Sequence, residues 1–211
     1  LNLGFVPDLL AVSTSRKIAV SHKDQIYSVD FSGVVSKLAE LSVGVLAFVG
    51  ETLYFGSGKD LYKLEEGVVL VESYSSEILG ICSDTLDTAV VTLSSKKVFR
   101  EKEFLFTLKE ATPYVYPVYL KEQLEVLYLC KHKLYLTNAL LCSNATSALV
   151  SGNFLLFTRQ NAPLDELYLF NTKDGLPFEL RDNPSLPSPA QDHFYSRSIE
   201  KGSEILCLGV T

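Results

Sequence analysis

The stretch Leu53-Tyr54-Phe55-Gly56-Ser57-Gly58-Lys59-Asp60-Leu61-Tyr62 decides the fold. It consists of an apolar run, a Gly-Ser-Gly turn, and an apolar residue followed by an aromatic one. Glycine-rich turns between such runs are typical of β-hairpins. The segment lacks the full G-x-x-x-x-G-K-[ST] spacing of a phosphate-binding loop, and it precedes a strand instead of a helix. It therefore predicts two antiparallel strands joined by a tight turn.

The apolar–aromatic pair that ends this stretch recurs along the chain. The five pairs are Ile26-Tyr27, Leu61-Tyr62, Val98-Phe99, Leu134-Tyr135 and Leu167-Tyr168. Their aromatic residues are 35, 37, 36 and 33 positions apart. A fixed period of this length indicates one supersecondary unit repeated along the chain.

Each unit has the same internal order of apolar segments. A near-continuous apolar run lies upstream of every pair, a further apolar segment precedes that run, and a weaker segment follows the pair. The runs are 18–20, 53–55, 89–91, 126–129 and 154–157, and the segments before them are 9–12, 45–49, 78–82, 115–120 and 148–150. Turn signals such as Phe31-Ser32-Gly33 separate the segments. Every unit therefore predicts four short strands.

The inner strands of each unit are apolar without polar alternation, so both of their faces must be covered. Four-stranded sheets achieve this by stacking on one another as the blades of a β-propeller. We therefore expect an all-β, WD40-like propeller with five blades in residues 1–181. The expected blades are 8–41, 42–75, 76–111, 112–145 and 146–181.

The last part of the chain departs from this repeat. Residues 182–198 are rich in proline and predict an exposed loop, and residues 199–211 predict the start of a further blade. Five blades fall short of a closed ring, so we expect the ring to be completed by sequence outside this segment. The absence of methionine also suggests a piece of a longer protein.

The composition restricts the function classes. Hydrophobic residues make up 47% and charged residues 21% of the chain, which is ordinary for a globular protein with a core. No apolar stretch approaches the length of a membrane span. The net charge of −6 argues against binding a phosphate backbone through the global field.

Four cysteines, at positions 82, 130, 142 and 207, lie in apolar runs without a C-x-x-C pair. We interpret them as small buried hydrophobic residues in a reducing compartment, with a disulfide as the alternative. This interpretation favours a cytoplasmic location, with the nucleus as a second location.

The sequence predicts no catalytic, cofactor-binding or metal-binding residues. The histidines His22, His132 and His193 do not recur between units and lack metal-ligand spacing. Propeller enzymes gather carboxylates or a metal at the axis, whereas the inner-strand carboxylates here occupy different registers. These carboxylates are Asp8, Glu51, Glu77, Asp84 and Glu122. Asp84 and Asp87 are interpreted as turn formers, and we expect no enzyme activity.

Two basic stretches, 96–102 and 121–133, have aromatic neighbours and suggest a weak nucleic-acid patch as one hypothesis. Lysines at strand edges also discourage aggregation, and this explanation covers the same residues. We therefore expect protein partners, with no membrane and no direct nucleic-acid contact.

The last third resembles the second propeller of the IKAP family, the largest scaffold subunits of the Elongator complex. The resemblance covers residues 134–211 and rests on Leu140–Ser147, Phe154–Thr158 and Arg197–Ile205. In the last of these, Lys201 replaces an arginine of the family's Arg-x-Val/Ile-Glu-Arg-Gly-Ser segment. The family's following Pro-Arg-Gly-Asn-Leu-Glu stretch does not occur before Thr211.

The resemblance implies a non-catalytic scaffold for a complex that modifies the wobble uridine of tRNA. The family's dimerisation and tRNA-contacting segments belong to a C-terminal arm outside this segment. Loops supply specificity on rigid scaffolds, so we expect partner contacts in two long loops. The expected contact residues are Gln160, Asn161, Asp165, Asn183, Ser188 and Gln191. The alternatives are a propeller of a vesicle coat, tether or nuclear-pore protein, and a propeller hydrolase or lactonase.

Overall fold

The strands of the chain form five antiparallel sheets in a computed structural model. The structure describes residues 3–30, 32–84, 86–113, 115–120, 123–151, 154–161 and 164–171. These residues contain nineteen strands. None of them forms a helix long and apolar enough to cross a membrane.

Each sheet is called a blade here, and its strands follow one another in chain order. Blade 1 contains β1 (Leu9–Val12), β2 (Ile18–His22), β3 (Gln25–Val29) and β4 (Val35–Glu40). Blade 2 contains β5 (Val45–Val49), β6 (Thr52–Ser57), β7 (Asp60–Leu64) and β8 (Val68–Ser73). Blade 3 contains β9 (Ile78–Ser83), β10 (Ala89–Leu93), β11 (Lys97–Arg100) and β12 (Glu103–Thr107). Blade 4 contains β13 (Val115–Leu120), β14 (Gln123–Cys130), β15 (Lys133–Leu136) and β16 (Ala139–Ser143). Blade 5 contains β17 (Ala145–Ser151), β18 (Phe154–Asn161) and β19 (Leu164–Asn171).

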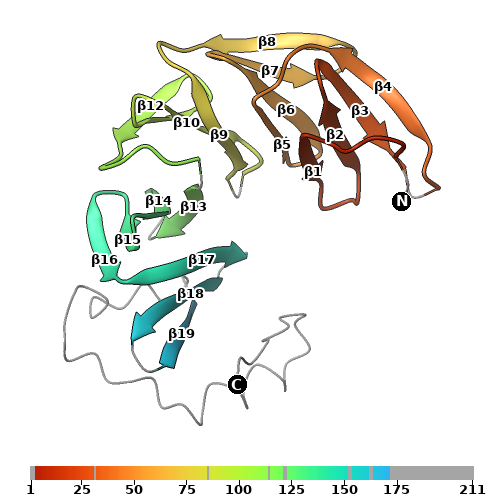
Figure 1. Cartoon of the computed structure of the whole chain (residues 1–211). Helices are drawn as coiled ribbons and strands as arrows, with labels where there is room; N and C mark the ends of the chain where they lie inside the picture. The colour runs from red at the N-terminus through yellow and green to blue at the C-terminus, as the bar shows by residue number, and fades with distance from the viewer. Residues whose placement is uncertain are drawn as a thin grey trace.

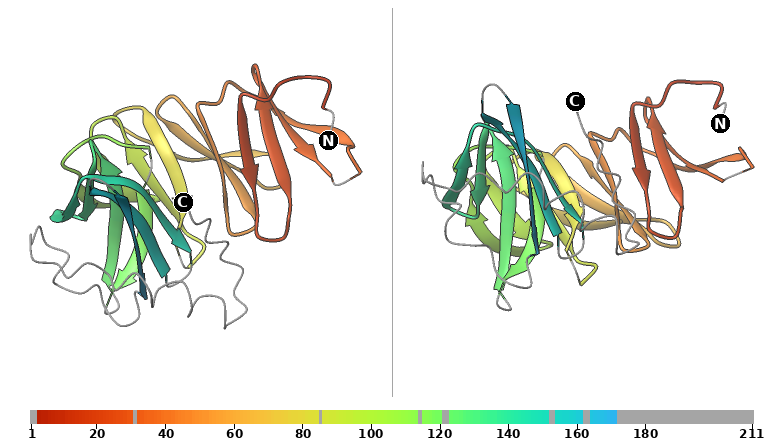
Figure 2. Two further views of the ribbon diagram at one scale, coloured as in Figure 1. Left: turned by 60° about the horizontal axis from the view of Figure 1, so that its bottom comes forward. Right: turned by 90° about the horizontal axis from the view of Figure 1, so that it is seen from below.

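The blades stand around an arc that stays open between blade 5 and blade 1 (Figure 1). The first strand of each blade contacts the first strand of the next, from β1 through β5, β9 and β13 to β17. In the turned views of Figure 2 the blades follow one another as layers along the arc. The expected all-β propeller of four-stranded blades, with an incomplete ring, is confirmed.

The core lies between the blades, in four hydrophobic clusters that fill the four junctions. Each cluster joins the apolar residue of an apolar–aromatic pair to the second strand of the next blade. The residues that share a cluster in this way are Ile26 and Phe55, Leu61 and Val91, Val98 and Tyr128, and Leu134 and Phe157. Burial of one such side chain contributes about 1.5–3 kcal/mol. Stacking of neighbouring blades therefore supplies the apolar burial that a single blade lacks.

A β-bulge also lies at the apolar–aromatic pair, in the pairing between the third and fourth strands. In blades 1 to 4, the pairing with the fourth strand shifts register between the apolar and the aromatic residue. The fourth strand carries one extra residue at this point, and that residue packs against the cluster of its junction. The extra residues are Leu38, Val71, Leu105 and Leu141. A bulge raises the local twist of a strand, so the same local twist is expected in the fourth strand of each of these four blades.

The expected cysteine environment is found in part. Cys142 is buried, whereas Cys82 and Cys130 are half-buried, and none of the three forms a disulfide with another described cysteine. Cys207 lies outside the described residues, as do residues 182–198 and 199–211, the predicted loop and further blade.

Candidate functional site

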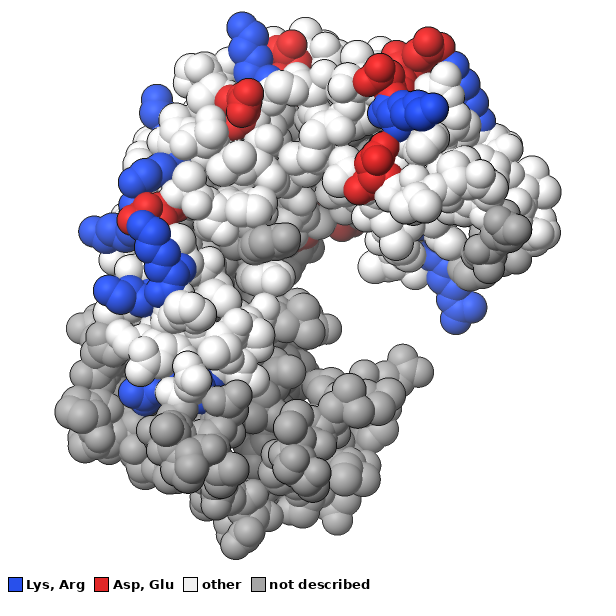
Figure 3. Space-filling view, viewed as in Figure 1, with Lys and Arg blue, Asp and Glu red and all other residues white. Residues whose placement is uncertain are grey.

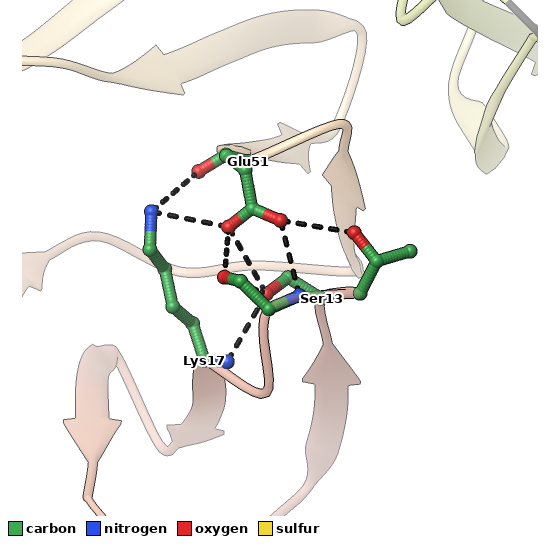
Figure 4. Close-up of polar contacts among 5 residues, drawn as sticks. Ser13, Lys17 and Glu51 are labelled. Atoms are coloured by element: carbon green, nitrogen blue, oxygen red, sulfur yellow. Dashed lines mark hydrogen bonds and ion pairs between the residues drawn. The ribbon is translucent and has the colours of Figure 1, made fainter.

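Glu51 links blade 2 to blade 1. This residue lies in the turn between β5 and β6, and its carboxylate reaches the turn between β1 and β2 (Figure 4). It accepts hydrogen bonds from Thr14 Oγ1 at 3.0 Å, from Ser15 N at 3.1 Å and from the Ser15 hydroxyl. The Ser13 hydroxyl donates to it at 3.3 Å. One carboxylate thus fixes a whole turn of the neighbouring blade.

Lys17 completes this arrangement, which we call the Glu51 clamp (Ser13, Thr14, Ser15, Lys17 and Glu51). Lys17 Nζ lies 3.2 Å from the Glu51 carboxylate and donates to the Glu51 carbonyl oxygen at 3.3 Å. The Ser13 hydroxyl also accepts a hydrogen bond from Lys17 N at 3.0 Å, which closes the turn. The turn and the carboxylate therefore hold each other in one geometry.

The hydrogen bond from the Ser15 hydroxyl is the main cause that lowers the pKa of Glu51 to about 2. Bonds from Thr14, Lys17 and Ser15 N act in the same direction and outweigh the partial desolvation. A carboxylate with such a low pKa is a poor general base at neutral pH. Its chemistry here is electrostatic attachment of one blade to the next.

A groove of about 610 Å³ opens beside the clamp, between blades 1 and 2. Its apolar wall includes Leu38, Phe48 and Leu64, which pack against the junction cluster but stay partly exposed. Its polar rim comes from the β1–β2 turn, the β3–β4 turn and Glu51. A hollow with an apolar wall and a few polar groups is the usual form of a binding site.

Arg16 stands on the rim of this groove, in the β1–β2 turn. Its backbone is held at a φ of 67° by the bond from its N–H to Ser13 O, at 3.0 Å. Within the described residues its guanidinium makes no hydrogen bond or ion pair, whereas Lys17 beside it is bound to Glu51. Arg16 therefore brings an uncompensated positive charge to the groove.

A second polar network joins blades 2 and 3. Tyr54 OH donates to the Glu101 carboxylate at 3.2 Å, and Tyr74 OH donates to the Glu101 carbonyl oxygen. Burial is the main cause that raises the pKa of Tyr54, with the charge of Glu101 acting in the same direction. These phenols therefore stay protonated and act as hydrogen-bond donors across the junction.

The carboxylates expected near the axis are not gathered at one point. Asp8 accepts a hydrogen bond from Lys23 N at 2.7 Å, Glu51 forms the clamp, and Glu77 precedes β9. Asp84 accepts bonds from Leu86 N and Thr88 N, both at 2.8 Å, and pairs with Arg100 Nε at 3.0 Å. The interpretation of Asp84 as a turn former is confirmed. Glu122 lies outside the described residues.

The two described histidines have ordinary surroundings. His22 stacks on Phe5 with ring centroids 4.7 Å apart, and its Nδ1 lies 3.0 Å from Val6 O. His132 is exposed in the turn between β14 and β15, and His193 lies outside the described residues. In the described part of the chain, no three His, Cys, Asp or Glu side chains are placed to hold a metal ion.

The prediction of a long loop at Gln160–Asp165 is wrong. Gln160 and Asn161 belong to β18, and Asp165 belongs to β19, with Gln160 paired to Asp165. Strand pairing continues to Asn161 and Leu164, so Gln160, Asn161 and Asp165 lie in paired strands and not in a loop. The predicted contact role of these residues stays a prediction. Asn183, Ser188 and Gln191 lie outside the described residues.

The two basic stretches meet at the junction of blades 3 and 4, which the sequence pattern did not indicate. Lys96 and Lys131 both pair with Glu110, at 3.7 and 3.1 Å, and Lys96 Nζ donates to Lys109 O at 2.9 Å. Figure 3 shows basic side chains along this edge of the arc, with acidic ones among them. Glu110 thus neutralises part of the positive charge that this edge would need to bind a phosphate backbone.

Comparison with known proteins agrees with the propeller architecture. A chain of the crystal structure of the mitotic checkpoint complex superposes with a TM-score of 0.54 at 16% identity, covering 82% of this chain and 64% of that one. The chain thus spans less than two thirds of that relative, which at this identity is similar in fold alone. Virginiamycin B lyase from Staphylococcus aureus gives a TM-score of 0.48 at 12% identity, covering 72% of this chain and 62% of the lyase. No curated protein matches the sequence.

Antiparallel blades stacked around an arc define a β-propeller. The family model described as the ELP1 N-terminal second beta-propeller matches residues 13–206. The chain therefore belongs to the family of the second propeller of ELP1, the IKAP subunit of Elongator. The resemblance of the last third to this family is confirmed, and the match extends it to nearly the whole chain.

Proposed function

We propose that this propeller is a non-catalytic scaffold that binds other protein subunits of the Elongator complex, which modifies the wobble uridine of tRNA. Membership of the ELP1 second-propeller family is the observation that carries the proposal. The physical mechanism is rigid display, because stacked blades fix the turns at their ends and the turns supply specificity. The Glu51 clamp is one such device, since it fixes the β1–β2 turn beside the groove.

Protein partners fit this surface better than nucleic acid does. The chain has a net charge of −6, and Glu110 pairs with two lysines of its most basic edge. A phosphate backbone is bound by uncompensated Lys and Arg side chains, so we assign tRNA contact to other parts of the complex. The described cysteines form no disulfide with one another, which fits a cytoplasmic location, and fractionation of cells expressing the tagged subunit would test this location.

The test replaces this propeller, within the complete subunit, by an unrelated propeller. We expect loss of at least one other subunit on co-purification and a fall in modified wobble uridine measured by mass spectrometry. Normal assembly together with normal modification would refute the scaffold role.

A second experiment separates a scaffold from an enzyme. The variants Asp8→Asn and Glu77→Gln change inner-strand carboxylates without disturbing a junction cluster. If the propeller is only a scaffold, we expect normal modification of the wobble uridine whenever the complex assembles. A loss of modification in a fully assembled complex would favour catalysis by this propeller.

A further inference from the structure

We infer that the groove between blades 1 and 2 binds an extended segment of a partner subunit that carries a carboxylate next to a large apolar side chain. This inference rests on the proposed scaffold function and names the surface and the chemistry of the partner. The groove residues that carry it are Arg16 on the rim and Leu38, Phe48 and Leu64 on the wall.

The apolar half of the recognition follows from the packing. Leu38, Phe48 and Leu64 contact the cluster between blades 1 and 2, but part of each side chain faces the groove. The volume of about 610 Å³ is enough for side chains of a peptide. An apolar partner side chain placed there would cover surface that neither blade covers.

The charged half of the recognition follows from the ion pairs and hydrogen bonds around the rim of the groove. The Glu51 carboxylate is saturated by the clamp, and Lys17 is neutralised by it. The Asp30 Oδ1 atom already accepts from Ser32 Oγ at 2.6 Å and from Val34 N at 2.8 Å. Asp30 keeps its negative charge because these donors are neutral. Arg16 is the rim charge whose side chain makes neither a hydrogen bond nor an ion pair within the described residues, so an anion of the partner would complement it.

Arg16 favours a carboxylate because its planar guanidinium can bind both oxygens at once. The clamp fixes the turn that carries Arg16, which lowers the entropy lost when a partner binds. The wall then selects an apolar neighbour for that carboxylate. Together these features describe an acidic–apolar peptide segment as the occupant.

The test uses the complete subunit assembled with the other purified Elongator subunits as the probe. A photo-crosslinking amino acid, p-benzoylphenylalanine, replaces Ser36, an exposed groove residue on β4. Irradiation and mass spectrometry should identify a segment of one partner subunit with Asp or Glu beside a large apolar residue. Crosslinking to a second copy, to the same chain, or to a segment without an acidic residue would overturn the inference.

Charge variants test the role of Arg16 in the same assembly. Arg16→Glu should lower the crosslink yield about tenfold, whereas Arg16→Lys, which keeps the charge but loses the second hydrogen bond, should lower it less. Lys59→Glu makes the same charge change in the β6–β7 turn, at the other end of the blade, and should leave the yield unchanged. Exchange of the crosslinked partner carboxylate for lysine should restore binding to Arg16→Glu. An equal yield from Arg16→Glu and the unsubstituted chain would overturn the inference.

The outcomes separate this inference from the scaffold proposal. If the other subunits do not co-purify with the complete subunit, the scaffold proposal itself fails. If they assemble normally and no crosslink forms at position 36, the groove inference fails and the scaffold proposal stands.

Discussion

Gly80 lies so close to Pro113 that a Cβ atom on the glycine would be 2.1 Å from the proline carbonyl oxygen. Gly80 belongs to β9 of blade 3, and Pro113 lies just before β13 of blade 4. The close approach of the two backbones is a contact between adjacent blades that only a residue without a side chain permits.

Gly80→Ala should therefore push blades 3 and 4 apart at their inner strands. We expect a loss of at least about 1–3 kcal/mol, the usual range for overpacking. Urea unfolding followed by far-ultraviolet circular dichroism measures it, since the chain has no tryptophan. Gly67→Ala is the matched control, because a Cβ there meets nothing within 4 Å. Equal stability of the two variants would contradict the close contact.

The junction clusters predict a second pattern of stability. Leu61→Ala removes a fully buried side chain between blades 2 and 3 and should cost about 2–5 kcal/mol. Leu70→Ala changes a residue of β8 that is 53% accessible, and should change stability by less than about 0.5 kcal/mol. The same urea experiment compares them. A cost at Leu70 as large as that at Leu61 would mean that β8 is covered in solution.

The period of the apolar–aromatic pairs was enough to predict the strands. Each pair lies in a third strand, and the apolar residues of the first four pairs, such as Ile26 and Leu134, are fully buried. Period and apolar runs are local properties, so a single sequence displays them. The β-bulges were not predictable in this way, because the extra residue, for example Leu141, is an apolar residue in an apolar segment.

The candidate site was less predictable than the fold. Glu51 was recognised as an inner carboxylate, but its partners lie in the β1–β2 turn of another blade, such as Ser15, 36 positions earlier. The run Ser13-Thr14-Ser15 was a signal of hydroxyl donors, yet only the stacking of blades shows which carboxylate they meet. The paired strands at Gln160–Asp165 were missed because strand pairing overrides the polar composition of that segment.

The low pKa of Glu51 leads to a third prediction, which concerns the stability of the junction between blades 1 and 2 in acid. A carboxylate whose pKa falls from its ordinary value of 4.5 to about 2 on folding stabilises the folded state above pH 4.5. This stabilisation is lost as the pH falls from 4.5 toward 2. Thermal unfolding should therefore show Glu51→Gln destabilised at pH 6, with the difference shrinking by pH 3. Glu103→Gln, an exposed carboxylate without a described partner, should not show this trend.

Cys82 gives a prediction on thiol reactivity. Burial, with a smaller effect from the charge of Asp84, raises the pKa of its thiol to about 12. Because the thiolate is the reactive form, alkylation at pH 8 should be slower than for an ordinary thiol by roughly a thousandfold. Iodoacetamide labelling with mass spectrometry should modify Cys82 in urea and leave it almost unmodified in the folded chain. Rapid labelling of Cys82 under folded conditions would mean that the junction of blades 3 and 4 opens readily, because this thiol packs against the cluster there.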